Sequence, residues 1–279
     1  MTLYYLADFF AEDIPGGGAE LSDAAIMDYL QQDFIKVKSN EITNVDSKGF
    51  YVISNRSLLS RDLMARFCML QNYIIIEHDF QFLEHRNPYL YKDAVAPDRD
   101  IPAIYRDFYK RAKAVFFQTA FQQDLFERNG IKGHFINLKT TPYSKDDIQL
   151  FKNLVESPTP ITTKAFAIID SSNEIKNTKG AVKFCNDNNF SCALIPSGQT
   201  RESFLRTLGG YAALVFFPTR PESCSRLATE ARILGLNVIT TPTYGAPLEH
   251  WFSLTGKPLI SKLETIIEVG INKISSYLP

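Results

Sequence analysis

Short apolar runs alternate with segments of helical spacing along almost the whole chain. The runs predicted to form strands are Leu3–Ala7, Phe34–Lys38, Phe50–Ser54, Tyr73–Ile76, Ala114–Phe117, Gly133–Leu138, Lys164–Ile169, Ser191–Ile195, Ala212–Phe217 and Asn237–Thr241. The segments predicted to form helices lie between them, at 21–31, 58–70, 101–112, 121–129, 145–155, 180–188 and 201–208, with one more that includes 227–234. Successive parallel strands need a crossover, usually a helix, so this alternation predicts doubly wound parallel sheets in an α/β fold.

The alternation is interrupted at residues 156–163. This segment contains two prolines and four hydroxyl residues, a composition typical of an interdomain linker. We therefore predict two domains, 1–157 and 158–262. The last residues, 263–279, belong to an apolar run of helical spacing that begins at Pro258 and predicts an amphipathic C-terminal helix.

Composition narrows the class of protein. The 279 residues are 45% hydrophobic, which is enough for one or two cores, and the formal net charge is −1. A nearly neutral chain is not expected to depend mainly on nucleic-acid phosphates for its affinity. The four cysteines show neither metal-ligand spacing nor a disulfide framework, which favours a reducing, cytoplasmic location. No apolar run reaches about 18 residues and no signal peptide is recognisable, so we expect no membrane span.

Two glutamates follow the apolar strand 212–217. Glu222 comes shortly after the strand, and Glu230 follows after seven intervening residues, within a predicted helix that Ser223 or Ser225 can cap. Loops at the carboxyl ends of parallel strands are where open α/β sheets bind ligands. An ionised carboxylate accepts two hydroxyl hydrogen bonds at once, so both side chains suit a hydroxyl-rich ligand.

The surrounding residues make this pattern more specific. Its members are Glu222, Glu230-Ala231, Gly235, Gly245-Ala246 and Glu249. Together they resemble the donor-sugar site of retaining glycosyltransferases with the GT-B fold, of the group 1 or glycogen-synthase-like kind. The resemblance implies two Rossmann-like domains whose parallel sheets face each other across a cleft. It also implies that Glu222 contacts the donor hexose and Glu230 the ribose hydroxyls. The plainer interpretation is that both glutamates are solvated helix positions.

A glycine run lies between the first predicted strand and the first predicted helix. Gly16, Gly17 and Gly18 are consecutive. Glycines let the backbone approach a ligand closely, and a helix start offers free N–H groups to an anion. The sequence Gly-Gly-Ala-Glu after a first strand resembles the same family, in which this loop lies near the donor diphosphate and the acceptor. The resemblance therefore assigns Gly17 and Gly18 to donor binding, and a flexible turn is the alternative.

A histidine follows the strand Tyr73–Ile76, at the edge of the predicted sheet that also carries the glycine loop. The strand is followed by Glu77, His78 and Asp79. In the family that the chain resembles, a histidine at this strand end is placed against the donor sugar. The resemblance thus gives His78, with Glu222, a positioning and electrostatic role in catalysis. A core histidine held by Asp79 or by a backbone carbonyl is the alternative interpretation.

The segment 80–100 is a long loop rich in aromatic and charged residues. Loops of this length without secondary structure are uncommon unless they are functional or disordered. Arg86 and Tyr89 offer hydrogen bonds and a stacking surface to sugars or bases, so we interpret this segment as an acceptor-side loop. A partner-binding loop or a simply packed loop is the alternative.

A lysine precedes a glycine at the head of the helix predicted over 180–188. Lys179-Gly180 resembles the family, in which this lysine neutralises the donor diphosphate. Five or six residues earlier the family usually has an arginine, whereas this chain has Asn173 and Glu174. Lys176 is the candidate replacement, although an ammonium lacks the bidentate geometry of a guanidinium. The departure predicts weaker donor binding or lost activity, and solvated helix-end charges are the plain alternative for both lysines.

The resemblance as a whole implies transfer of a sugar from a nucleotide-sugar donor to an acceptor hydroxyl, with retention. It implies no metal and no other cofactor, because helix N-termini and lysines stabilise the leaving diphosphate. It also implies that 263–279 packs back toward the first domain. The acceptor class stays open between a glycan, a lipid, a protein and a modified DNA base.

Three other functions remain open at this point. One is a DNA-base glucosyltransferase of the kind some bacteriophages carry, which would use a basic and aromatic groove around Arg86–Lys92. Another is a non-catalytic binding protein with a GT-B-like fold, which would account for the absent arginine. The third is an unrelated α/β binding protein without nucleotide affinity.

Overall fold

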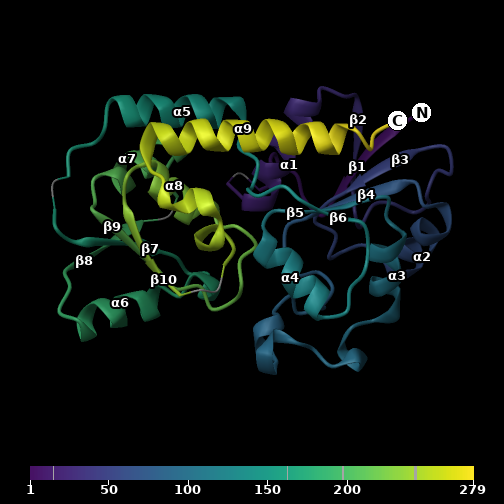
Figure 1. Ribbon diagram of the computed structural model, residues 1–279, viewed down its shortest axis with the longest axis horizontal. Coiled ribbons are helices and arrows are strands. Elements are labelled where there is room, and N and C mark those ends of the chain that lie inside the picture. The colour runs from purple at the N-terminus through teal and green to yellow at the C-terminus, as the bar shows by residue number, and fades with distance from the viewer. Residues whose placement is uncertain (15, 162, 197, 242–243) are drawn as a thin grey trace. The chain divides into compact units, whose positions relative to one another are not determined.

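The computed structural model describes residues 1–14, 16–161, 163–196, 198–241 and 244–279 (Figure 1). They form two compact units, Met1–Ser144 with Ile266–Pro279, and Lys145–Thr265. Each unit is built on its own parallel sheet, six-stranded in the first and four-stranded in the second. Thr162, in the predicted linker, lies outside the described residues.

The first unit has the strand order β2-β1-β3-β4-β5-β6. Its strands are β1 (Leu3–Ala7), β2 (Phe34–Lys38), β3 (Phe50–Ile53), β4 (Tyr73–Glu77), β5 (Val115–Phe117) and β6 (Phe135–Asn137). Every residue of β3, β4 and β5 is buried, because helices cover both faces of a parallel sheet. This burial explains why these strands are continuous apolar runs rather than alternating ones.

Helices connect these strands as the pattern predicted. They are α1 (Gly18–Leu30), α2 (Arg61–Leu70), α3 (Ala103–Arg111) and α4 (Ala120–Arg128). The helix α2 begins three residues later than expected because Ser60 caps it, accepting a hydrogen bond from the backbone N–H of Leu63. An aromatic cluster fills the space between α2, α3 and the sheet, with the Tyr73 and Phe108 rings stacked at 4.9 Å.

The long loop 80–100 is ordered by packing. It contains short 3₁₀ turns at Pro88–Leu90, Lys92–Ala94 and Asp98–Asp100. Near its start, Phe80, Phe82 and Leu83 are buried in the core of the first unit. The loop is therefore anchored at its base, and its middle carries the exposed side chains.

The second unit has the strand order β10-β9-β7-β8. Its strands are β7 (Phe166–Asp170), β8 (Cys192–Pro196), β9 (Ala213–Phe216) and β10 (Asn237–Thr240), and its helices include α5 (Lys145–Glu156), α6 (Thr178–Asp187), α7 (Arg201–Gly209) and α8 (Arg226–Ile233). The division between the units places α5 in the second one, whereas the sequence-based division counted these residues with the first domain.

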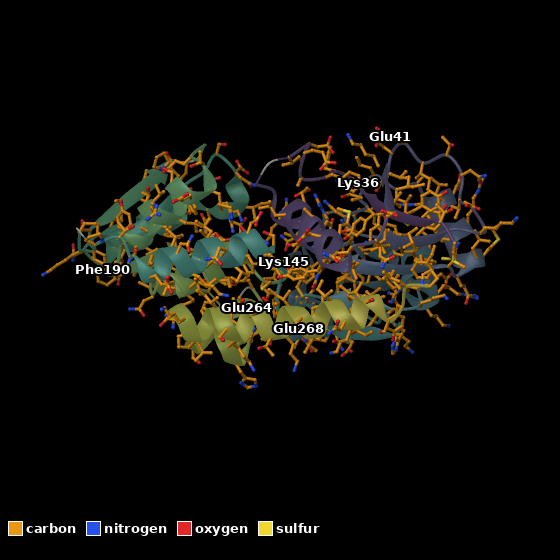
Figure 2. The ribbon with its side chains drawn as sticks, turned by 90° about the horizontal axis from the view of Figure 1, so that it is seen from above. Lys36, Glu41, Lys145, Phe190, Glu264 and Glu268 are labelled. Atoms are coloured by element: carbon orange, nitrogen blue, oxygen red, sulfur yellow. The ribbon has the colours of Figure 1, made fainter. Side chains whose placement is uncertain are left out.

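The last helix is α9 (Gly256–Ser275). Its residues up to Thr265 belong to the second unit and those from Ile266 onward to the first. Within the second unit it runs antiparallel to α5, and Glu264, labelled in Figure 2, pairs with Lys152 at 2.7 Å. A second pair joins Lys257 to Glu156 at 3.1 Å. Among the described residues, no helix is long and apolar enough to cross a membrane.

Candidate functional site

The loops after two neighbouring strands of the second unit bring Lys176 and Glu222 together. Strands β7 and β9 are parallel neighbours, so their carboxyl ends open at the same edge of the sheet. Lys176 lies after β7, and its Nζ is 2.7 Å from Oε1 of Glu222, which lies after β9. The Lys176 ammonium also lies 5.3 Å from the centroid of the Phe216 ring. The pair thus places a cation and a carboxylate side by side at the carboxyl edge of the second sheet.

Backbone and side-chain hydrogen bonds fix these two loops to each other. The N–H of Thr219 donates to the carbonyl of Ile175 at 2.9 Å. Nδ2 of Asn177 donates to the carbonyl of Phe217, also at 2.9 Å. Glu222 itself precedes the helix α8, which Ser225 caps, and forms a parallel bridge with Tyr244. Glu222 therefore sits in an ordered loop, not on the helix that carries Glu230.

The head of α6 has a structural reason for its lysine-glycine sequence. Asn177 has a left-handed backbone, with φ 53°, and its Oδ1 accepts a hydrogen bond from the N–H of Gly180 at 3.1 Å. A side chain at Gly180 would place a Cβ 2.5 Å from the amide of Asn177, so glycine suits this cap. Lys179 is exposed at the first turn. Asn173, in the place of the expected arginine, accepts a hydrogen bond from the N–H of Ile175 at 3.0 Å.

Glu230 is buried and belongs to a cluster of four charged side chains. Its Oε1 is 3.0 Å from Nη2 of Arg201 and 3.7 Å from Nε of Arg226. Both arginines also pair with Asp147, Arg201 at 2.6 Å and Arg226 at 2.8 Å. Burial opposes the charge of Arg201, but Glu230 and Asp147 outweigh it and raise the pKa of the guanidinium above its usual value.

In the first unit, His78 directly follows β4 and is almost fully buried. Its Nε2 is 2.7 Å from Oδ1 of Asp23 on α1, and its Nδ1 is 2.7 Å from the amide nitrogen of Gln118. Asp23 also accepts hydrogen bonds from Tyr5 at 2.8 Å and from Ser54 at 2.6 Å. The alternative interpretation of this histidine named Asp79 or a backbone carbonyl and did not name Asp23 or Gln118, which contact its two ring nitrogens.

The environment of His78 favours its charged form. Burial alone lowers the pKa of an imidazole, but the charge and hydrogen bond of Asp23 raise the pKa of His78 above its ordinary value. Nδ1 of an imidazole protonated at Nε2 accepts from an amide N–H, whereas Nδ1–H of an imidazolium donates to an amide oxygen, so an amide side chain can pair with either form.

The glycines predicted to bind the donor lie at the start of α1. Gly17 is the residue before the helix and Gly18 its first residue. A Cβ at Gly17 would lie 2.1 Å from Oε2 of Glu20, so the absence of a side chain lets this glutamate fold back over the loop. Burial raises the pKa of Glu20.

The two predicted acceptor-side residues lie in the middle of the loop 80–100. Nη1 of Arg86 is 3.4 Å from a carboxylate oxygen of Asp79. Tyr89 keeps 38% of its surface exposed, and its ring meets the ring of Phe121 edge-on at 6.5 Å. Tyr89 is thus partly exposed, and Arg86 has a carboxylate beside it.

Comparison with known proteins identifies the fold. No family model matches the sequence, and no curated protein matches it. Among solved structures, HepE from Anabaena in complex with UDP is 12% identical, with a TM-score of 0.55 over 99% of this chain and 95% of that one. Sucrose-phosphate synthase from Thermosynechococcus elongatus is 9% identical, with a TM-score of 0.60 over 99% and 98%.

A third structure is the UDP-forming α,α-trehalose-phosphate synthase from Burkholderia xenovorans in complex with glucose-6-phosphate. It is 10% identical, with a TM-score of 0.55 over 99% of this chain and 93% of that one. The chain has a GT-B fold. The predicted α/β fold of GT-B type is therefore confirmed. The roles assigned to individual residues remain predictions at identities this low.

The GT-B fold also shows what sequence reasoning missed. Gln118 is the first residue after β5, as His78 is after β4, so its position at a strand end was a usable signal. Asp147 and Arg201 gave no such signal, because their partners lie on other helices, whereas the spacing of Arg226 and Glu230, four residues apart on α8, was one.

Side chains that can serve as metal ligands do not gather in the described part of the chain. Across 1–14, 16–161, 163–196, 198–241 and 244–279, no three His, Cys, Asp or Glu side chains form a group that could hold a metal ion. The prediction that the reaction needs no metal or other cofactor rests on the family resemblance and remains a prediction.

Proposed function

We propose that this protein transfers a sugar from a nucleotide-sugar donor to an acceptor hydroxyl, with retention at the anomeric carbon. The observation that carries the proposal is the pairing of Lys176 with Glu222 at 2.7 Å, at the carboxyl edge of the second sheet. The GT-B fold supports it, as does the binding of UDP and of UDP-glucose by Anabaena HepE.

The two partners of this pair suit the two parts of a nucleotide sugar. An ammonium stabilises a diphosphate oxygen, and a carboxylate accepts hydrogen bonds from hexose hydroxyls. We assign Lys176 and the exposed Lys179 to the diphosphate, Glu222 to the hexose and Glu230 to the ribose. Leaving-group stabilisation then rests on two point charges and the head of α6, because the place of the family arginine is taken by Asn173.

The first unit supplies the remaining roles in the proposal. Gly17 and Gly18 bring backbone N–H groups to the donor, and His78, held by Asp23 and Gln118, contributes its positive charge to the site of the donor sugar. Arg86 and Tyr89 contact the acceptor. In the family that the chain resembles, the acceptor attacks on the face of the leaving group, so no protein nucleophile is assigned. We also retain a cytoplasmic location as part of the proposal.

Lys176 provides the sharpest test. Losing a charge-assisted contact to a phosphate costs about 1.5–3 kcal/mol, so Lys176→Ala is expected to weaken nucleotide-sugar binding roughly ten- to hundredfold. Calorimetry after a thermal-shift screen of UDP, GDP, ADP and their sugars gives this affinity. Lys183→Ala is the control, because Lys183 lies on the following helix, α6, and among the described residues its ion pair is with the exposed Asp187 at 2.7 Å, not with Glu222. Unchanged affinity in both Lys176→Ala and Glu222→Gln would remove this pair from the site.

Transfer itself needs a separate measurement. Release of nucleoside diphosphate in the presence of candidate acceptors reports turnover, and NMR of the anomeric proton of the product reports its stereochemistry. An inverted product contradicts retention. Nucleotide binding without transfer to any glycan, lipid, protein or hydroxymethylated DNA favours the second candidate, a non-catalytic binding protein, for which the substitution of Asn173 and Glu174 at the arginine position is the supporting observation.

A further inference from the structure

Glu230 and three other charged side chains, from three helices of the second unit, form a closed ring of ion pairs. Asp147 lies on α5, Arg201 begins α7, and Arg226 and Glu230 lie on α8. Around the ring, Asp147 pairs with Arg201 at 2.6 Å, Arg201 with Glu230 at 3.0 Å, and Arg226 with Asp147 at 2.8 Å. The fourth pair joins Arg226 Nε to Oε1 of Glu230 at 3.7 Å and closes the ring. Positive and negative groups alternate, so the ring is neutral.

The ring restricts the orientation of the Glu230 carboxylate. The Arg201 guanidinium is planar, and it engages Asp147 through Nε and Glu230 through Nη2 at the same time. Two hydrogen bonds from one rigid plane fix the rotation of that plane and hence the direction from which Glu230 is held. Arg201 also lies over the Phe151 ring, 5.7 Å from its centroid. Glu230 keeps only 4% of its side-chain surface exposed, so water screens these contacts little.

The ring uses only one oxygen of Glu230. Both arginines contact Oε1, and no residue in the described part of the chain forms a hydrogen bond with Oε2. A carboxylate held through one oxygen presents its other oxygen in a defined direction. That arrangement suits a ligand hydroxyl whose hydrogen bond must point along a fixed line.

We propose that Arg201, Arg226 and Asp147 are positioning residues that orient Glu230 toward the vicinal hydroxyls of the donor ribose. This inference rests on the proposed function, since it takes the ligand to be a ribonucleotide. It goes beyond that function by assigning ribose recognition to a ring of charges that links α5, α7 and α8. Its consequence is that damage to the ring lowers affinity through the ribose hydroxyls and through no other part of the nucleotide.

The test compares a nucleoside diphosphate with its 2′,3′-dideoxy analogue. UDP and dideoxy-UDP are titrated into the wild type, Arg201→Gln, Arg201→Lys and Glu230→Gln, or the GDP or ADP pair if the screen selects that base. Arg206→Gln is the control, because Arg206 lies on α7 and, among the described residues, its ion pair is with Glu202, outside the ring. Arg201→Gln is expected to weaken UDP about tenfold, the effect typical of losing a group that orients a ligand-binding side chain. Arg201→Lys is expected to lose less, and dideoxy-UDP is expected to bind every variant alike.

Each outcome decides between specific alternatives. If Glu230→Gln weakens UDP and Arg201→Gln does not, Glu230 binds ribose without help from the ring and the inference is wrong. If Arg201→Gln weakens UDP and dideoxy-UDP equally, Arg201 acts on another part of the nucleotide and the inference is also wrong. If Glu230→Gln leaves UDP affinity unchanged while transfer proceeds, the ribose role fails but the proposed function stands.

Melting temperatures without ligand separate positioning from folding. If Arg201→Gln does not fold, UDP and dideoxy-UDP are compared in Arg201→Lys instead, because that variant keeps a positive charge beside both carboxylates. A folded Arg201→Lys that binds UDP exactly as the wild type does, with dideoxy-UDP weaker in both, would overturn the positioning role.

Discussion

At the scale of single residues, His78 shows how one contact decides the charge of a side chain. It is buried, which by itself favours the neutral imidazole, yet Asp23 lies 2.7 Å from Nε2. The pKa of His78 is therefore raised above the ordinary value of about 6.5. The stability that its charge contributes is fully present below about pH 6.5 and is lost as the pH rises through the higher, folded-state pKa.

Asp23→Asn tests this account. Without the Asp23 carboxylate, burial is opposed only by the smaller effects of Glu77 and Glu20, so the pKa of His78 is expected to fall. Titration of the histidine Cε1 protons by NMR gives the pKa, and His78→Gln assigns the resonance among the four histidines. A pKa that stays raised in Asp23→Asn would mean that another group, such as Glu77 or Glu20, controls the titration.

At the scale of elements, caps and strand ends position the site. Asn177 joins the head of α6 to the loop after β9, because its Oδ1 accepts from Gly180 and its Nδ2 donates to Phe217. Its left-handed backbone, with φ 53°, is one that asparagine and glycine tolerate and alanine does not. One residue thus sets both the start of the helix and the place of Lys176 next to it.

Asn177→Ala and Asn177→Gly separate these two contributions. Both remove the cap, but only alanine is strained at positive φ, so Asn177→Ala is expected to destabilise the second unit by about 2 kcal/mol and Asn177→Gly by less. Trp251 is the single tryptophan in the sequence and is buried in the second unit, so its fluorescence during urea unfolding of the full chain reports this unit. Equal losses for both variants would show that the backbone conformation contributes nothing.

At the scale of the whole molecule, each unit has its own core. Phe108 is fully buried in the first unit and packs on Phe67 and Tyr73. Truncation of a buried phenylalanine costs about 3–5 kcal/mol through lost contacts and the cavity left behind. The free energy of unfolding is therefore lowered for the unit that contains Phe108.

Phe108→Ala is therefore expected to weaken the first unit selectively. Hydrogen exchange read by mass spectrometry should show faster exchange in peptides from the strands β3, β4 and β5, with peptides from β7 and β9 close to the wild type. Equal acceleration in the peptides of both sheets would contradict separate cores.

The sequence by itself determined the elements and their order. Apolar runs, helical spacing and caps are local properties, so the strands, the helices and the parallel α/β fold followed from them, and strand-end positions marked His78 and Glu222. Several bounds moved by up to three residues, as at α2, which Ser60 caps, and at α1, which begins at Gly18.

Only the tertiary structure decided which charges meet. Arg201 and Asp147 are 54 positions apart, and His78 and Asp23 are 55 apart, so no local pattern joins either pair. Whether Glu230 is solvated or enclosed by arginines, and whether His78 is charged, depends on contacts of about 3 Å between elements distant in the chain. A sequence pattern determines the face of a helix or strand on which a residue lies. The packing of the elements determines which residue lies against it there.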